Sequence, residues 1–160
     1  MDTRPAAYAV IIDNEHILLS RWVPHIPGMQ PGWTLPGGGM EPGEQPGESA
    51  VREVFEETGY TVELDELLGV NTAYYPPAEG SELPFCALRI IFRARTVGGE
   101  LTHEIGGSTD RAAWIPLSEL DQHFYYPSVD EAARLLGYPH AVALAEHYRS
   151  LGTDTEKKES

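Results

Sequence analysis

Hydrophobic residues gather in short β-prone runs in the first two thirds of the chain. Residues 6–12 (AAYAVII) and 16–22 (HILLSRW) are two such runs, separated by the polar residues Asp13, Asn14 and Glu15. Because polar residues of this kind favour turns, the pattern predicts a β-hairpin at the start of the domain. Further runs predict strands at residues 62–73 and 85–97, a Pro/Gly/acid loop between them at 75–84, and a short last strand at Trp114 and Ile115.

Helical spacing of apolar residues begins at Glu48. Ala50, Val51 and Val54 share one face of a helix predicted over residues 48–58, and Gly59 follows as a C-terminal stop. Two more helices are predicted at residues 128–136 and 141–151, each followed by a glycine. Strands around one central helix, with further helices at the end, indicate an α/β or α+β sandwich in a single domain over residues 1–152. Residues 153–160 have no apolar anchor and are expected to form a disordered tail.

The segment 23–47 differs from its surroundings in composition. It holds six of the 13 prolines and seven of the 16 glycines, and its only β-prone interruption runs over residues 33–35. Loops of this length inside a domain are usually functional or disordered. Because Met29, Trp33 and Leu35 are apolar or aromatic, we interpret this loop as functional.

Composition and charge narrow the classes of function. With 160 residues, 41% of them hydrophobic, the chain fits one globular domain rather than a disordered, collagen-like or coiled-coil protein. Its formal charge of −14 opposes binding to polymeric nucleic acid, and a small anionic substrate is expected only where cations mediate. The lone Cys86 allows no intrachain disulfide, and no apolar run approaches the roughly twenty residues of a membrane span. A cytoplasmic protein without membrane or nucleic-acid partners is therefore expected.

Three acidic residues carry the strongest chemical signal. Glu53, Glu56 and Glu57 lie at i, i+3 and i+4 of the predicted helix, so their carboxylates share one face. Arg52 is expected to point elsewhere around the helix, which leaves the like charges without local neutralisation. Mg²⁺ bound by carboxylates, water and phosphate oxygens would supply the missing charge. A plain solvated acidic face, as in an interaction domain, is the alternative interpretation of the three glutamates alone.

The residues before this helix add a longer pattern. Gly37, Gly38 and Gly39 either form a plain turn or bring the backbone close to whatever occupies the acidic face. The full set of fixed positions is Gly38, Glu44, Arg52, Glu53, Glu56, Glu57 and Gly59, with Tyr60 next. Seven such identities would coincide by chance about once in a hundred million starting positions. The pattern and its lead-in, WTLPGG over residues 33–38, resemble the signature box of the Nudix hydrolases, which include MutT-like nucleoside diphosphate-X pyrophosphohydrolases; the last box position is usually aliphatic but is Tyr60 here.

The resemblance implies an α/β/α sandwich with a mixed β-sheet between helices, and hydrolysis of a diphosphate bond. Mg²⁺ or Mn²⁺ is then held by Glu53, Glu56 and Glu57 with a carbonyl of Gly37 or Gly38. Metals of this kind neutralise phosphate oxygens and lower the pKa of an attacking water. By the same resemblance, Arg52 and Glu44 orient the catalytic carboxylates. The general base is Glu53 or a downstream acid, for which Glu104, Glu100 and Asp110 are the candidates.

The substrate implied by the family is a small nucleotide derivative. Nucleotide sugars, ADP-ribose-like compounds and nucleoside triphosphates are the leading classes, and Arg21, Trp33 and Tyr75 are expected to contact the substrate. Aromatic rings near the cleft can stack on a base. The alternative function is a non-catalytic nucleotide sensor on the same fold, and a homodimer is one assembly open to the chain.

Overall fold

Strand β1 (Asp2–Asp13) is the centre of the β-structure. The computed structural model describes the backbone of residues 1–159 and the side chains of residues 1–152. On one edge, β1 pairs in parallel with β6 (Phe85–Gly99), which pairs antiparallel with β5 (Tyr60–Tyr75). On the other edge, it pairs antiparallel with the short β4 (Gly37–Gly39). The sheet is therefore mixed, and the apolar run in β1 reflects a strand with buried residues on both faces.

The hairpin predicted from the first two runs exists only at its tip. Asn14 and Glu15 have φ angles of 46° and 60°, as a two-residue turn between antiparallel strands requires. Only Ile12–Ile17 and Asp13–His16 are paired across it. Beyond the tip, β2 (His16–Trp22) leaves β1 and pairs with β3 (Gly32–Thr34) and β7 (Thr109–Pro116). The strands diverge because β1 already has β4 and β6 as its edge partners.

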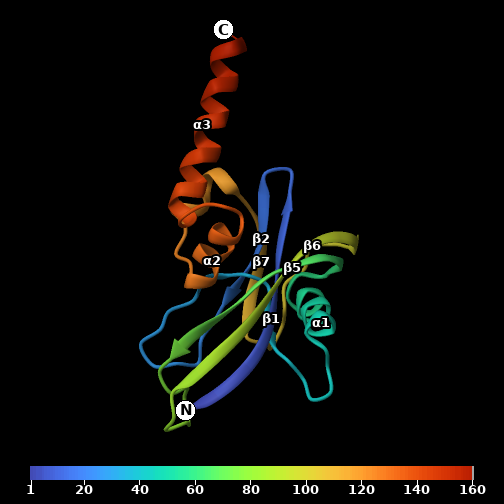
Figure 1. Ribbon diagram of the computed structural model, residues 1–160, viewed down its shortest axis with the longest axis vertical. Helices are drawn as coiled ribbons and strands as arrows, with labels where there is room; N and C mark the ends of the chain where they lie inside the picture. Colours follow the sequence, from blue (N-terminus) through green and yellow to red (C-terminus); the bar gives the residue numbers. More distant parts are fainter. Residues whose placement is uncertain (160) are drawn as a thin grey trace.

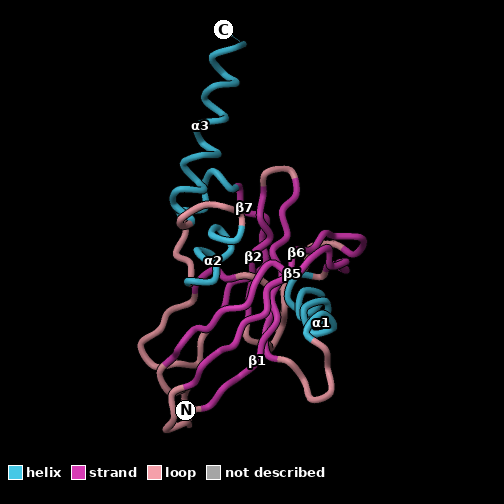
Figure 2. The backbone as a smooth tube through the Cα atoms, viewed as in Figure 1, coloured by secondary structure: helices cyan, strands magenta, loops and turns pink. Residues whose placement is uncertain are grey.

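Helices cover the strands from both sides. In Figure 1, α1 (Pro46–Thr58) lies on one side of the strands, and α2 (Pro127–Leu135) and α3 (Ala141–Glu159) lie on the other. A short 3₁₀ helix, η1 (Leu117–Gln122), connects β7 to this second side and packs on α3. Figure 2 shows the same separation of strands and helices along the backbone. The predicted α/β/α sandwich with a mixed sheet is confirmed.

Two hydrophobic cores lie on the two sides of β1. Ala9 and Ile11 face α1 and pack with Val54, whereas Val10 belongs to the larger core under α2, α3 and η1. Tyr60 joins the α1 side, where its hydroxyl accepts a hydrogen bond from Trp114 Nε1 at 3.0 Å. The aromatic at this box position thus fills an apolar slot and also satisfies a buried donor. Among the described residues, no helix has both the length and the apolar character to cross a bilayer.

Several element boundaries differ from the predictions. Helix α1 begins at Pro46, where the backbone N–H of Gln45 donates to Glu48 Oε2 at 3.5 Å. Gly37, Gly38 and Gly39 form strand β4 rather than the plain turn that was one of their two interpretations, because they pair with the free edge of β1. The last strand is β7, longer than the predicted dipeptide. The backbone of α3 is helical to Glu159; the side chains of residues 153–160 lie outside the described part, so the disordered tail stays a prediction.

Candidate active site

A buried carboxylate, that of Glu57, anchors the site. Only 1% of Glu57 is exposed. It accepts hydrogen bonds from Ser20 Oγ at 2.9 Å and from the backbone N–H of Gly37 at 3.1 Å. Burial, and secondly repulsion from Glu53, raise the pKa of Glu57 well above its usual range, although both hydrogen bonds oppose the shift. One charged group therefore connects α1, β2 and β4.

Glu53 lies one helical turn before Glu57, against the glycine strand. A Cβ on Gly38 would lie 2.9 Å from Glu53 Cδ, which is closer than real contacts allow. Gly38 therefore provides the space that the Glu53 carboxylate occupies. Burial raises the pKa of Glu53 against a hydrogen bond from Arg52, and repulsion from Glu56 adds to the rise. The two carboxylates are thus close, partly desolvated and mutually repelling.

Arg52 connects the acidic residues into one network. Its Nε and Nη2 donate to the two carboxylate oxygens of Glu44 at 2.7 and 3.0 Å, and Nη2 also donates to Gly39 O. Its Nη1 donates to Glu53 at 3.0 Å and to Glu56 at 3.1 Å. The sequence-based expectation that Arg52 points away was wrong, because its long side chain reaches back over the i+1 and i+4 carboxylates. The hydrogen bond from Arg52 lowers the pKa of Glu44 to about 2.

The oxygen atoms that converge at this site suit a divalent cation. The carboxylates of Glu53 and Glu57 offer only oxygen ligands, which hard cations such as Mg²⁺ prefer. In the part of the chain with described side chains, no three His, Cys, Asp or Glu residues are already arranged around a metal position. Glu56 is instead held by Arg52. The arrangement fits Mg²⁺, since this ion typically takes one or two carboxylates and completes its shell with water and phosphate oxygens.

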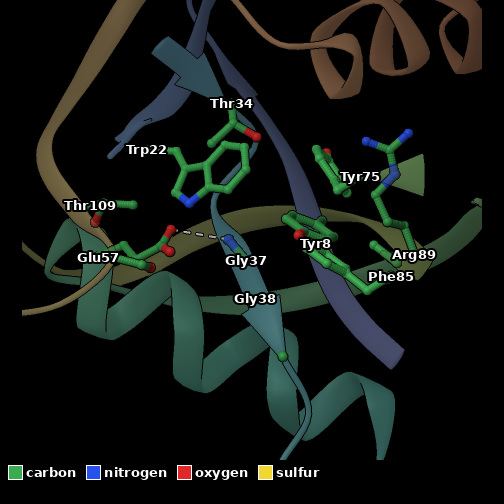
Figure 3. A pocket seen from close by; sticks show the side chains of 13 residues that line it. Tyr8, Trp22, Thr34, Gly37, Gly38, Glu57, Tyr75, Phe85, Arg89 and Thr109 are labelled. Carbon is green, nitrogen blue, oxygen red and sulfur yellow. Dashed lines mark hydrogen bonds between the residues drawn. The ribbon is translucent and has the colours of Figure 1, made fainter. Parts of the chain in front are cut away.

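A cavity of about 200 Å³ opens beside Glu57. In Figure 3, Glu57 lies at one end and Arg89 at the other, and Gly37 and the rings of Trp22, Tyr8 and Tyr75 lie between them. Tyr75 stacks on Phe85 with ring centroids 5.0 Å apart and meets the edge of Trp22 at 5.7 Å. The full lining is Tyr8, Trp22, Thr34, Gly37–Gly39, Glu57, Tyr75, Phe85, Ala87, Arg89, Ser108 and Thr109. Such a lining suits a ligand with a planar part and an anionic part.

The downstream acids take different positions. Glu104 Oε2 accepts hydrogen bonds from the backbone N–H of Thr109 at 3.2 Å and from Thr109 Oγ1 at 2.5 Å, which holds it beside the cavity. Asp110 is paired with Arg21, and the hydrogen bond from that guanidinium lowers the pKa of Asp110. Glu100 is exposed directly after β6. Of the three, Glu104 is the one brought near the box carboxylates, since its charge contributes to the raised pKa values of Glu53 and Glu57, after burial as the main cause.

Two of the three predicted substrate contacts lie away from the cavity. Tyr75 lines it, but Arg21 and Trp33 do not. Side chains alternate along a strand, so Arg21 faces opposite to Ser20 and Trp22 and binds Asp110. Trp33 packs edge-on to His123 and against the larger core. The lining of this cavity therefore does not support substrate contacts by Arg21 and Trp33, which stay predictions.

The sequence-based prediction missed several residues at the site, and four of them have polar groups that bear on its chemistry. Ser20 holds Glu57, Thr109 holds Glu104, and Tyr8 and Arg89 line the cavity. Ser20 and Arg89 each interrupt a run of apolar residues within a strand, which was the available signal. Tyr8 and Thr109 carry no such signal, because aromatic and β-branched residues are ordinary in strands.

The comparison with known families agrees with this geometry. A model of the NUDIX domain matches residues 2–136, most of the chain. The chain therefore belongs to the NUDIX domain family.

Individual relatives resemble the chain in part or as a whole fold. Human diphosphoinositol polyphosphate phosphohydrolase 3-alpha is 63% identical over 38 residues, which is 24% of this chain and 23% of that protein. A NUDIX hydrolase structure from Nitrosomonas europaea is 26% identical, with a TM-score of 0.65, and the match covers 84% of this chain and 88% of that one. The MutT protein of Methanosarcina mazei is 21% identical, with a TM-score of 0.59 and coverage of 94% and 96%. At that identity the MutT likeness concerns the fold.

A glycine pair in β4 offers a test of the site geometry. Gly38→Ala places a Cβ against the Glu53 carboxylate, whereas Gly39→Ala meets nothing within 4 Å. We expect Gly38→Ala to lower kcat by about tenfold or more by displacing Glu53, with little change in unfolding temperature. Gly39→Ala is the matched control and should keep near-normal kcat. Equal activity of the two variants would contradict the assigned contact.

The buried charge of Glu57 predicts a pH-dependent effect on stability. Because the pKa of Glu57 is raised in the folded protein, the folded state loses stability progressively as the pH rises from about 4 toward that raised pKa. It loses none below about pH 4, where the carboxyl is protonated in both the folded and the unfolded state. Glu57→Gln keeps an oxygen acceptor and removes the charge. In EDTA, urea unfolding should show the variant more stable than the wild type at pH 7 to 8, with the difference vanishing toward pH 4. Glu66→Gln, at an exposed position, is the control; a destabilised Glu57→Gln at every pH would refute the account.

Proposed function

We propose that this protein is a Nudix hydrolase that uses Mg²⁺ or Mn²⁺ to cleave the diphosphate bond of a nucleoside diphosphate derivative. The observation that carries the proposal is the pair of desolvated carboxylates, Glu53 and Glu57, the second of which lines a cavity with aromatic walls. Their mutual repulsion favours a bound cation. A protein that only sensed nucleotides would have no need of such converging carboxylates.

Each residue of the network has a defined task in this proposal. Glu53 and Glu57 would hold the cation, which supplies neutralisation of the phosphate oxygens and a lowered pKa of the attacking water. Ser20 and the Gly37 N–H fix the orientation of Glu57. Arg52, itself held by Glu44, fixes the orientation of Glu53. It also holds Glu56 nearby, where Glu56 would serve as a further ligand. Preorganised carboxylates of this kind reduce the cost of rearrangement during the reaction.

Glu104 is our candidate for the general base. A carboxylate bound to a cation is a poor proton acceptor, because the nearby positive charge favours its ionised form. Glu104 is held outside the box by Thr109 and still lies near Glu53 and Glu57. It lies before Gly106 and Gly107 in the segment between β6 and β7, so backbone freedom there can bring it over the substrate. The alternative base is Glu53 itself.

The cavity lining supports a nucleotide over a diphosphoinositol polyphosphate. A highly phosphorylated inositol needs many cationic partners, since each phosphate carries negative charge. Among the described side chains, Arg89 is the one basic residue that lines the cavity, and the whole chain carries −14. The aromatic rings of Tyr8, Trp22 and Tyr75 line the cavity and suit stacking with a base, whereas the Phe85 ring is already stacked by Tyr75 and covered by Arg4. The short but close match to diphosphoinositol polyphosphate phosphohydrolases makes their substrate class the second candidate.

A substrate panel tests the proposal. Nucleotide sugars, ADP-ribose, nucleoside triphosphates and a diphosphoinositol polyphosphate are incubated with the protein and Mg²⁺, and the phosphate products are measured. We expect hydrolysis of nucleoside diphosphate derivatives, abolished by EDTA and lowered about a hundredfold by Glu53→Gln. Hydrolysis of the inositol compound alone would overturn the substrate class. Full activity in EDTA would overturn the role of the cation.

The effects of a Glu104 substitution on kcat and on KM test whether Glu104 is the general base. If Glu104 accepts a proton only in the transition state, Glu104→Gln should lower kcat strongly and leave KM within a fewfold. Glu100→Gln, at an exposed position in the same segment, is the matched control and should keep wild-type kcat. If Glu104→Gln keeps the wild-type kcat while Glu53→Gln loses most of it, the general base is Glu53 on α1 instead of Glu104.

A further inference from the structure

Arg89 occupies a position where the fold calls for an apolar residue. It lies on β6, an inner strand between β1 and β5, in a row of alternate residues with Phe85, Ala87 and Ile91. These residues share one face of the strand, and all four are buried. Arg89 itself is 5% exposed. A charged side chain in such a row needs a partner or a ligand, because burying an unpaired charge is costly.

The direct partner of Arg89 is neutral. Its Nε donates to Asn71 Oδ1 at 2.8 Å, and within the described side chains its two terminal nitrogens have no hydrogen-bond partner. Arg89 also acts electrostatically on Glu131, but that carboxylate is already paired with Arg134. Burial raises the pKa of Glu131, but hydrogen bonds from Arg134 and Asn71 and the charges of Arg134 and Arg89 lower it overall. Asn71 thus holds the guanidinium through the Nε of Arg89 and leaves Nη1 and Nη2 available to a ligand.

The available end of Arg89 lies beside aromatic rings. In Figure 3, its guanidinium stands next to Tyr75, at the opposite end of the cavity from Glu57. Arg89 and Tyr75 also line a second cavity of about 280 Å³ between β5 and α2, so they separate two open spaces. A ligand that spans the cavity with its diphosphate at Glu57 would place its far part beside Tyr75 and Arg89. Stacking surface beside a fork of N–H donors is an arrangement that recognises a planar base by its edge.

We propose that Arg89 selects the base of the substrate by donating two parallel hydrogen bonds to two adjacent acceptors. Guanine offers such a pair in O6 and N7, and cytosine offers one in O2 and N3. Adenine sets an amino donor beside each ring acceptor on its N6 side, and uracil sets N3–H between its two carbonyls. Arg89 therefore favours guanosine and cytidine diphosphate derivatives over adenosine and uridine ones. The inference rests on the proposed function, because it concerns the same cavity and the same substrates.

Four matched substrates test the selection. GDP-glucose, CDP-glucose, ADP-glucose and UDP-glucose differ in the base and share the diphosphate and the sugar. With Mg²⁺, the wild type should show kcat/KM about tenfold or more higher for the first two, the scale of one bidentate contact. Binding of GMP, CMP, AMP and UMP, measured by titration calorimetry, should follow the same order and gives a readout independent of hydrolysis.

Two substitutions of Arg89 distinguish the effect of its planar guanidinium from the effect of its charge, and a control substitution elsewhere on β6 tests whether the effect is specific to this position. Arg89→Lys keeps a cation but lacks the planar fork, and Arg89→Met removes both. Each should reduce kcat/KM on GDP-glucose and CDP-glucose about tenfold while leaving ADP-glucose and UDP-glucose within about twofold. Arg95→Gln, on the same strand but paired at the surface with Glu63, is the control and should keep the base preference. If Arg89→Met fails to fold in a thermal melt, the wild-type order and Arg89→Lys decide.

The outcomes distinguish the two proposals. Rates on the four sugars within twofold of each other, or an equal loss on all four in Arg89→Lys, would overturn base selection and leave the hydrolase proposal standing. Base-ordered binding without hydrolysis of any of the four would exclude nucleotide sugars as the substrates and leave the assignment of Arg89 standing. Absence of both binding and hydrolysis would overturn base selection and exclude nucleotide sugars.

Discussion

The architecture of the site depends on one unfavourable group, the buried carboxylate of Glu57. Its two hydrogen bonds join a helix, a sheet strand and the glycine strand, so the position of α1 relative to the cavity depends on keeping a charge out of water. Burial and repulsion from Glu53 oppose that charge. Proteins retain such costly groups where function uses them, and here a divalent cation is the proposed compensation.

Around this group, each neighbouring residue limits the freedom of the next. Gly38 leaves room for the Glu53 carboxylate, and Arg52 joins Glu53 to Glu44, whose own pKa is lowered to about 2 by the hydrogen bond from Arg52. The arginine also partly neutralises Glu53 and Glu56. In the proposed mechanism these contacts hold the carboxylates in one arrangement before substrate arrives, which is where electrostatic catalysis gains most.

Much of the fold and of the acidic cluster follows from the sequence, because both are local in the chain. Helix α1 and the long strands appear as periodic apolar patterns, and the spacing of Glu53 and Glu57 alone places them on one helix face. Long-range features could not be predicted in this way. The divergence of β2 from β1 depends on β4, β6 and β7, which compete for strand edges. Arg21 and Trp33 lie outside the cavity lining, and sequence alone could not show this because one residue of register decides which face of a strand a side chain occupies.

The most direct test of the account is the linkage between cation binding and folding stability. The free energy of unfolding in urea is measured in EDTA and in millimolar Mg²⁺ or Mn²⁺, for the wild type and for the double variant Glu53→Gln, Glu57→Gln. A cation that binds only the folded state raises stability with its concentration. We predict a clear gain for the wild type and none for the double variant. Equal stability of the wild type with and without the cation would contradict the central claim that these carboxylates form a cation site.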